Sequence, residues 1–515
     1  MKYITLLFLL LSSLSSYSQE TIVNDANKAE AELHVAINPL DSNNIVIATQ
    51  HDFGGVFDIT IYYTTDFGNT WDTSNYHGVP PGYDFGGDAV LSFDATGNVL
   101  LVSLAAISAS ASVNTLLSKS TDGGAHWLPV ATIATGSTDK PWIAIDRYST
   151  SPYLDNIYIP LVENNLNLYT LDNTYQSSSP LIIPNGEHLP SVVVKKDGTV
   201  FTSDVKMSSP NVVFVQQYSN GGSNLVHSTQ VVSFPDYLFN APDVSLRYQP
   251  TAYLAIDNSG GSHDGRLYLS YTASETNNPD YFNIYITYSD DNALTWSTPS
   301  IVNSNQQDEV QQFYSSIYVN DNGVLILDWY DRKNYLNTTK LTDFYMGVSN
   351  DGGASFSEIQ LNTQASDFNY VIPSCTNFGI GEYHQLVATN NTALAFWSDG
   401  RTNDGDLNIY MTKVNLANAL SIQEASLISD KITISSLYPI PVSDVFYSNI
   451  DLKENTRIKY QILNSSGSVL ENTEWVEYHT GKHKLEFNID LSAGVYFITF
   501  SSDKGYFKTM KFIKL

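Results

Sequence analysis

The chain has 515 residues, enough for two or three domains of about 100–200 residues each. Its 25 Lys and Arg face 53 Asp and Glu, and this net charge of −28 excludes a protein that binds nucleic acid through a basic face. The apolar content of 42% excludes a disordered acidic chain, and the single cysteine excludes an internal disulfide framework. Aromatic residues at 12% and charged residues at only 15% favour a soluble, β-rich protein.

The amino terminus has the pattern of a signal peptide. Lys2 precedes an apolar run from Ile4 to Leu11, and small residues follow as far as Ser18. The run is too short to cross a membrane, which takes about 20 apolar residues, and no other segment reaches that length. We expect residues 1–19 to direct export, and the mature protein to leave the cytoplasm without a membrane span.

Four segments of the central region share the pattern Ser/Thr-x-Asp-x-Gly-x-Ser/Thr-aromatic. They are Thr64–Trp71, Ser120–Trp127, Ser289–Trp296 and Ser349–Phe356, with the aspartates Asp66, Asp122, Asp291 and Asp351. An aspartate can accept hydrogen bonds from the N–H groups of its own turn, and glycine takes a positive φ without penalty. We expect the aromatic ring to fold back onto the strands it has just left. The third copy has Ala293 in place of glycine, which predicts a modified turn.

The repeats extend beyond these four turns. An Asp or Asn followed by an alternating apolar strand precedes each turn by six residues, and the same register finds weaker copies at Asn165, Asn211 and Asn408. Each unit also has an upstream strand pair, which makes four strands a unit. Four-stranded units that repeat radially form a β-propeller. We predict an all-β fold with seven blades over residues 20–425. Six blades are the alternative, because the unit at Asn165 is the weakest.

The four turns resemble the bacterial neuraminidase repeat, or Asp-box, of the sialidase-like propeller superfamily. The resemblance implies the propeller fold. It does not fix the function, because Asp-box propellers include sialidases, other glycosidases, binding proteins and assembly factors.

Residues 426–515 differ in composition and predict a second domain. From Lys431 onward there are ten Lys and Arg and nine Asp and Glu, against 15 and 44 before it. Short alternating strands separated by turns, as at Asp503-Lys504-Gly505, predict a small β-sandwich.

The motifs of this tail are Tyr438-Pro-Ile-Pro-Val-Ser-Asp444, a turn at Gly467, Ile489-Asp-Leu-Ser-Ala-Gly-Val-Tyr-Phe497 and the closing Lys511-Phe-Ile-Lys514. Together they resemble the C-terminal sorting domain of type IX secretion cargo. The resemblance implies a bacterium of the Bacteroidota, passage through the periplasm, and release or attachment at the outer-membrane surface. It makes the type IX secretion machinery an expected partner.

Propeller topology sorts the candidate site residues by face. The Asp-box turns join the third and fourth strands of a unit, so they lie opposite the loops between the second and third strands, and we assign them a structural role. The other face collects carboxylates at the starts of the innermost strands, namely Glu32, Asp88, Asp139 and Glu382. Two carboxylates across a glycosidic bond are what glycoside hydrolysis needs. Glu382 and Tyr383 are neighbours, which in a strand predicts opposite directions.

Two loops on that face couple an indole, a carboxylate and a guanidinium. They are Trp329-Tyr-Asp331-Arg332 and Trp397-Ser-Asp399-Gly-Arg401. As a ligand site, the indoles would stack on sugar rings while the charged groups bind hydroxyls or a carboxylate. As a structural device, an Asp–Arg bridge would order each loop, and recurrence in two adjacent units favours this alternative.

Several classes of site find little support. Sialidases hold the substrate carboxylate with three arginines, whereas this propeller has only Arg147, Arg247, Arg266, Arg332 and Arg401, so true sialidase activity is not expected. Asn403-Asp-Gly-Asp406 can offer oxygens to Ca²⁺ but lacks the remaining ligands, so we expect no metal or cofactor.

Three hypotheses remain, and the sequence leaves open whether the protein is an enzyme. The first is an exported recognition protein that binds glycan or protein on an acidic, aromatic channel face. The second is a glycosidase with a carboxylate pair acting on a neutral or cationic polysaccharide. The third is a surface scaffold that contacts other envelope proteins.

Overall fold

The computed structural model describes residues 18–24, 29–53, 56–76, 82–108, 112–235, 251–274, 281–304, 310–335, 340–369, 380–402, 406–420, 431–464, 468–504 and 506–515. They divide into two compact units, Met1–Ala419 and Leu420–Leu515. Within these residues no helix has the length and apolar character needed to cross a membrane.

The described part of the first unit contains seven antiparallel sheets, each a meander of four strands in chain order or nearly so. The first three sheets are β2 (Glu30–Ile37), β3 (Ile45–Phe53), β4 (Val56–Thr64) and β5 (Asp72–Thr73); β6 (Phe85–Phe93), β7 (Val99–Ala106), β8 (Asn114–Ser120) and β9 (Leu128–Ala134); and β10 (Ala144–Ile145), β11 (Ile157–Val162), β12 (Leu166–Leu171) and β13 (Leu181–Ile182). The next three are β14 (His188–Val194), β15 (Val200–Lys206), β16 (Asn211–Ser219) and β17 (Asn224–Phe234); β18 (Ala252–Ile256), β19 (Leu267–Ala273), β20 (Asn283–Ser289) and β21 (Ser300–Ile301); and β22 (Gln312–Val319), β23 (Leu325–Asp331), β24 (Leu341–Ser349) and β25 (Ser357–Gln360), with β26 (Ser366–Asp367) beside β24.

The last sheet combines both ends of the first unit. Its inner strands are β27 (Leu386–Ala388), β28 (Thr392–Asp399) and β29 (Asn408–Asn415), and its outermost strand is β1 (Ser18–Asn24), antiparallel to β29. Arg401 lies 2.5 Å from Glu20 and ties β1 to this sheet. Ser18 and Gln19, which fall inside the predicted signal peptide, belong to β1, and residues 1–17 lie outside the described residues.

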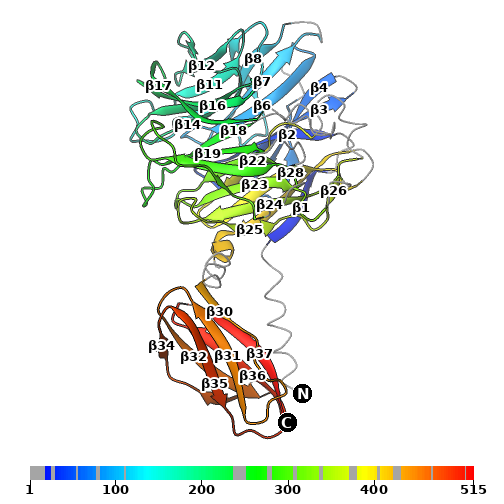
Figure 1. The fold of residues 1–515 in the computed structure, drawn as a ribbon. Helices are drawn as coiled ribbons and strands as arrows, with labels where there is room; N and C mark the ends of the chain where they lie inside the picture. Colours follow the sequence, from blue (N-terminus) through cyan, green and yellow to red (C-terminus); the bar gives the residue numbers. More distant parts are fainter. Residues whose placement is uncertain are drawn as a thin grey trace. The chain divides into compact units, whose positions relative to one another are not determined.

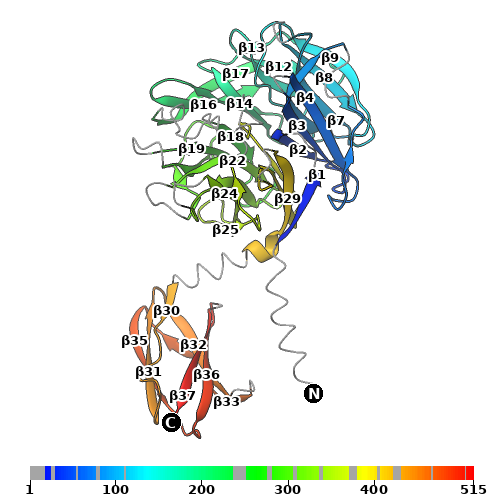
Figure 2. The ribbon, with the colours of Figure 1, turned by 90° about the vertical axis from the view of Figure 1, so that its right-hand side faces the viewer.

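The innermost strands form a closed ring. Each contacts the next, in the order β2, β6, β10, β14, β18, β22, β27 and back to β2. Figures 1 and 2 show the sheets of the first unit arranged around this centre. The predicted all-β propeller followed by a β-sandwich is confirmed. The unit that the sequence marks as weakest, around Asn165, contributes β12 to a four-stranded sheet of its own.

Apolar residues fill the space between neighbouring sheets. Val46 and Ile61 of the first sheet, for example, share a buried cluster with Leu91 and Leu101 of the second. Because a propeller sheet is covered on both faces, its strands read as nearly continuous apolar runs. Burying each of these side chains contributes about 1.5–3 kcal/mol.

The four Asp-box turns join the third and fourth strands of their sheets. In each, the aspartate Oδ1 accepts the N–H of the residue four positions on, at 2.9 Å for Thr70, His126 and Thr295 and 3.0 Å for Ser355. The opening Ser or Thr hydroxyl accepts the N–H of the glycine position, as at Gly68 and Gly124.

One detail of these turns corrects the sequence expectations. The turn at Ala293 is not modified, because alanine takes the left-handed conformation there with φ +66° and keeps the same hydrogen bonds. The aromatic ring of the first turn packs against a cluster that includes Ile45 and Tyr62 of its own sheet, and it also meets Phe396 of the neighbouring sheet at 6.0 Å. A side chain at Gly124 would also collide with Val46 of the preceding sheet, so that glycine permits close packing between sheets.

The second unit is a β-sandwich. One sheet has the order β30 (Ile432–Ile434), β31 (Val445–Leu452), β35 (Gly481–Asn488), and the other has the order β33 (Val469–Asn472), β32 (Thr456–Asn464), β36 (Gly494–Ser502), β37 (Phe507–Lys514), with β34 (Val476–Tyr478) beside β32. Phe446, Phe487, Ile498 and Phe512 are buried in the core of this unit.

Candidate functional site

The innermost strands carry a repeated irregularity at their starts. The pairing of β2 with β3 shifts register between Ala31 and His34, and β6, β14 and β22 shift at the corresponding point. The first residue inside each shift has a positive φ, namely Glu32, Asp88, Leu189 and Tyr314, and Lys140 ahead of β10 has the same conformation. A bulge re-aims side chains relative to a regular strand. It directs polar groups of several sheets toward the same central region.

Three of the four predicted carboxylates lie within 4.0 Å of one ammonium group at this level. Lys140 Nζ lies 2.5 Å from Glu382 Oε2, 3.6 Å from Asp88 Oδ2 and 3.9 Å from Glu32 Oε1. Burial disfavours the charged lysine, but Asp88, Glu32 and Glu382 outweigh it and hold the pKa of Lys140 well above its usual value. The lysine is therefore a permanent cation inside the cluster.

The fourth carboxylate, Asp139, lies at the more accessible edge of the cluster. It is half-buried, whereas Glu32, Asp88, Lys140 and Glu382 are buried. Burial first, and then the charge of Asp88, raises the pKa of Asp139 to about 6, and a hydrogen bond joins the two carboxyl groups. Asp139 can thus carry a proton close to neutral pH.

A cavity of about 240 Å³ opens beside Asp139 on the face of the loops between second and third strands. Its charged lining residues are Glu32, Asp88, Asp139 and Lys140, and Gln50 and His188 also line it. The other walls come from neighbouring sheets and are largely apolar or small: Phe57, Phe85, Gly86, Gly87, Leu104 and Val113. Among the described residues that line it, Lys140 is the only Lys or Arg.

A layer of aromatic rings lies at the next level of the innermost strands. Trp142 stacks on Tyr253 at 5.1 Å and meets His34 and Tyr383 edge-on at 4.9 and 5.7 Å. The expectation that Glu382 and Tyr383 point to opposite faces is wrong, because residues 380–385 precede β27 and form no strand. Glu382 contacts Lys140 and Tyr383 packs on Trp142, so both side chains point toward the centre of the ring.

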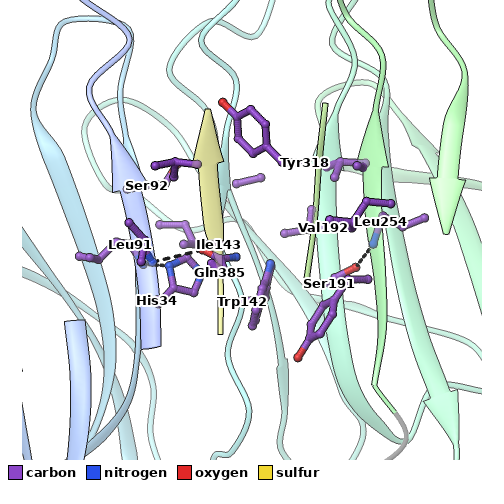
Figure 3. A pocket seen from close by; sticks show the side chains of 18 of the residues that line it. His34, Leu91, Ser92, Trp142, Ile143, Ser191, Val192, Leu254, Tyr318 and Gln385 are labelled. Carbon is purple, nitrogen blue, oxygen red and sulfur yellow. Dashed lines mark hydrogen bonds between the residues drawn. The ribbon is translucent and has the colours of Figure 1, made fainter. Parts of the chain in front are cut away.

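A second cavity of about 240 Å³ lies further along the innermost strands (Figure 3). His34 of β2 and Trp142 ahead of β10 line it, as do Arg147 and Tyr148 just after β10 and Tyr318 of β22. Leu91 donates its N–H to His34 Nδ1 at 3.0 Å, and burial lowers the pKa of His34 to about 3, so the imidazole is neutral.

The two indole-containing loops do not form an open ligand surface. Trp329 and Trp397 are 0% and 1% exposed, so neither ring has a face available to a sugar, and the expected stacking role is contradicted. Instead each indole N–H is donated to the aspartate two residues on, at 3.0 Å to Asp331 and 2.8 Å to Asp399.

The arginines of these loops differ from each other. Arg401 donates to Asp399 at 2.6 Å, which is the predicted intra-loop bridge. Arg332 instead donates to Thr342 and Gln311, at 3.0 and 2.8 Å. Both guanidinium groups are therefore engaged within the propeller, and the loops act as structural clamps.

In the described residues, no group of three or more His, Cys, Asp or Glu is placed to hold a metal ion. An ammonium group already occupies the centre of the carboxylate cluster. The Ca²⁺ candidate at Asn403–Asp406 falls largely outside the described residues, which there include only Asp406.

Sequence reasoning missed Lys140, the residue around which the site is organised. One signal was available: a lysine directly after Asp139 and before Pro141, in a propeller poor in basic residues. The register shift that turns this lysine inward leaves no mark in the alternation of the sequence.

Residues 436–515 match the family model of the secretion system C-terminal sorting domain. No curated protein shows significant sequence similarity to the chain. Among solved structures, a protein of unknown function from Dyadobacter fermentans is 13% identical, with 78% of this chain and 99% of that chain covered and a TM-score of 0.43.

Two further similar structures have titles that name an activity. The α-L-arabinofuranosidase of Fusarium graminearum is 11% identical over 78% of this chain and 99% of its own, with a TM-score of 0.44. The endosialidase of phage phi92 is 11% identical over 78% of this chain and 69% of its own, also with a TM-score of 0.44. The chain is a β-propeller followed by a β-sandwich that matches a secretion sorting domain, and this match marks it as a protein exported by type IX secretion to the cell surface or the extracellular space.

Proposed function

We propose that this exported propeller binds an uncharged or cationic glycan in the cavity beside Asp139. The observation that carries the proposal is the composition of that cavity: apolar and aromatic walls together with the three carboxyl groups of Glu32, Asp88 and Asp139. Phe57 and Phe85 offer apolar surface to sugar rings, and Asp88 and Asp139 offer acceptors to hydroxyl or ammonium groups.

Charge argues against anionic ligands. The single cation of the cavity, Lys140, is committed to Glu382, Asp88 and Glu32, so it has little left for a sugar carboxylate. The whole chain carries a net charge of −28, which disfavours the approach of anions.

The test is calorimetric titration of the full chain with neutral, amino-bearing and uronic-acid-bearing oligosaccharides. Asp139→Asn removes a charged acceptor worth about 1.5–3 kcal/mol, so affinity should fall about tenfold or more. Asp264→Asn, an exposed aspartate in the turn after the innermost strand β18, is the matched control and should leave affinity unchanged. Preferential binding of the uronic-acid-bearing sugars would refute the proposal.

Glycoside hydrolysis is the second candidate, favoured by the raised pKa of Asp139, which suits a general acid. The geometry of the Asp139–Asp88 pair makes hydrolysis the second candidate function rather than the first. Asp139 and Asp88 are hydrogen-bonded to each other, closer than the separation of about 5–5.5 Å in retaining glycosidases. Turnover of chromogenic glycosides that falls as pH rises through about 6, and disappears in Asp139→Asn, would move hydrolysis to first place.

A further inference from the structure

The second unit has an unusual outer surface on one of its two sheets. Val469 pairs with Leu463, which pairs with Phe497 on the next strand, and Val495 pairs with Ile513 beside them. Paired residues share a face, so apolar side chains extend across all four strands β33, β32, β36 and β37. Val469, Val495 and Ile513 are 50%, 39% and 40% exposed.

The other sheet of the sandwich has the expected polar exterior. On β31 and β35, Asn449 pairs with Lys484, Asp451 pairs with Lys482, and Glu486 is exposed. An antiparallel sheet normally buries one face and presents polar residues on the other. Contiguous exposed apolar residues on a small domain mark a surface that another molecule covers.

We propose that this apolar face, defined by Leu463, Val469, Val495, Phe497 and Ile513, docks on an apolar surface of the type IX secretion machinery. Residues 436–515 match a secretion sorting domain, so the machinery has to recognise something in this unit. Charge offers little for recognition, because ten Lys and Arg balance nine Asp and Glu from Lys431 onward. Other exposed apolar residues, such as Leu470, Trp475 and Val476, lie in or beside the short strands β33 and β34, whereas the apolar face crosses all four strands of one sheet.

The experiment expresses the full chain in a bacterium that has a type IX system and compares exported with periplasmic protein by immunoblot. Val495→Thr combined with Ile513→Thr keeps the β-branched shape but removes apolar contact. Losing two interface contacts of about 1 kcal/mol each weakens binding about tenfold or more. We expect export to fall by a similar factor. Val476→Thr is the control, since Val476 is 48% exposed but pairs with the buried Ile458 on the other side of the same sheet.

Folding is checked by thermal unfolding of the purified full-length variants, which should match the wild type. Should the double variant fold poorly, Val469→Thr changes the same face at an exposed residue of the edge strand β33, and should also reduce export. Normal export of a folded face variant would overturn the proposal. So would a mass in solution that falls from dimer to monomer, because a second copy would then be the occupant.

Discussion

Lys140 Nζ and Glu382 Oε2 are 2.5 Å apart although they come from sheets that are not neighbours in the ring. Lys140 precedes β10, Glu382 precedes β27, and β2 and β6 lie between those strands. The ion pair therefore spans the channel and links distant parts of the ring through its centre. Because both groups are buried, each depends on the other for its charge to be tolerated.

Replacing Lys140 by Met should strongly destabilise the propeller. It would leave Glu32, Asp88 and Glu382 as buried carboxylates without their cation, which costs about 3–5 kcal/mol. Chemical denaturation at pH 7 measures the loss, and lowering the pH should recover part of it by protonating the carboxylates. Lys196→Met removes a half-exposed lysine paired with Asp264 and should cost less than about 1 kcal/mol. Equal effects of both substitutions would contradict the role assigned to Lys140.

The ionisation of Asp139 should make stability depend on pH. Its pKa rises from 3.8 unfolded to about 6 folded, so the native state binds the extra proton. The free energy of unfolding should therefore fall as pH increases from about 4 to about 6, by on the order of 1–3 kcal/mol. Asp139→Asn cannot titrate and should lose this part of the pH dependence. A variant that retains the full wild-type slope would show that another group is responsible.

The ionisation of Glu30 should also make stability depend on pH, at higher pH than the ionisation of Asp139. It is fully buried, accepts hydrogen bonds from Tyr62 and Asn24, and burial raises its pKa from 4.5 to about 8. Stability should fall by roughly 2–4 kcal/mol as pH rises from about 5 to about 8. Glu30→Gln keeps the size and should remove the fall above about pH 7, leaving the fall at lower pH that Asp139 causes. A steep fall in the Gln variant between about pH 7 and 8 would refute the assignment.

Trp397 should matter for stability rather than for binding. The ring is buried against Phe344 at 4.9 Å, and its N–H is held by Asp399. Trp397→Ala should cost about 3–5 kcal/mol of unfolding free energy. Trp397→Phe keeps most of the packing and should cost less, and a folded Phe variant should bind glycan like the wild type. Lost affinity in that folded variant would restore the sugar-stacking role.

The periodic features of the sequence predicted the propeller, because every sheet needs the same turns and the same apolar strands. The turn at Asp66 and its three equivalents each follow the end of a third strand, and the weaker copies at Asn165, Asn211 and Asn408 mark the start of the third strand in other sheets. Chain-order meanders then follow, since sequential strands pair. The one strand this logic could not supply was β1, which pairs with β29 across nearly the whole first unit.

The sequence predicted the carboxylates at the centre of the candidate site but not the lysine between them. The four carboxylates at the starts of the innermost strands were singled out because topology places those starts on one face. Lys140 was not, because the bulges that turn its side chain inward depend on pairing register, which alternation does not encode. The prediction that Trp329 and Trp397 stack on sugar rings was wrong. A tryptophan beside an aspartate and an arginine looks the same in sequence whether it faces solvent or a neighbouring sheet.

The pairing of β1 with β29 determines when the first unit can be completed during synthesis. β1 has no partner strand until β29, almost four hundred residues later in the sequence, has been synthesised. Contacts of such separation form slowly. The first unit therefore keeps one unpaired strand for most of its synthesis, and its last sheet gains its outer edge only after β29 has formed.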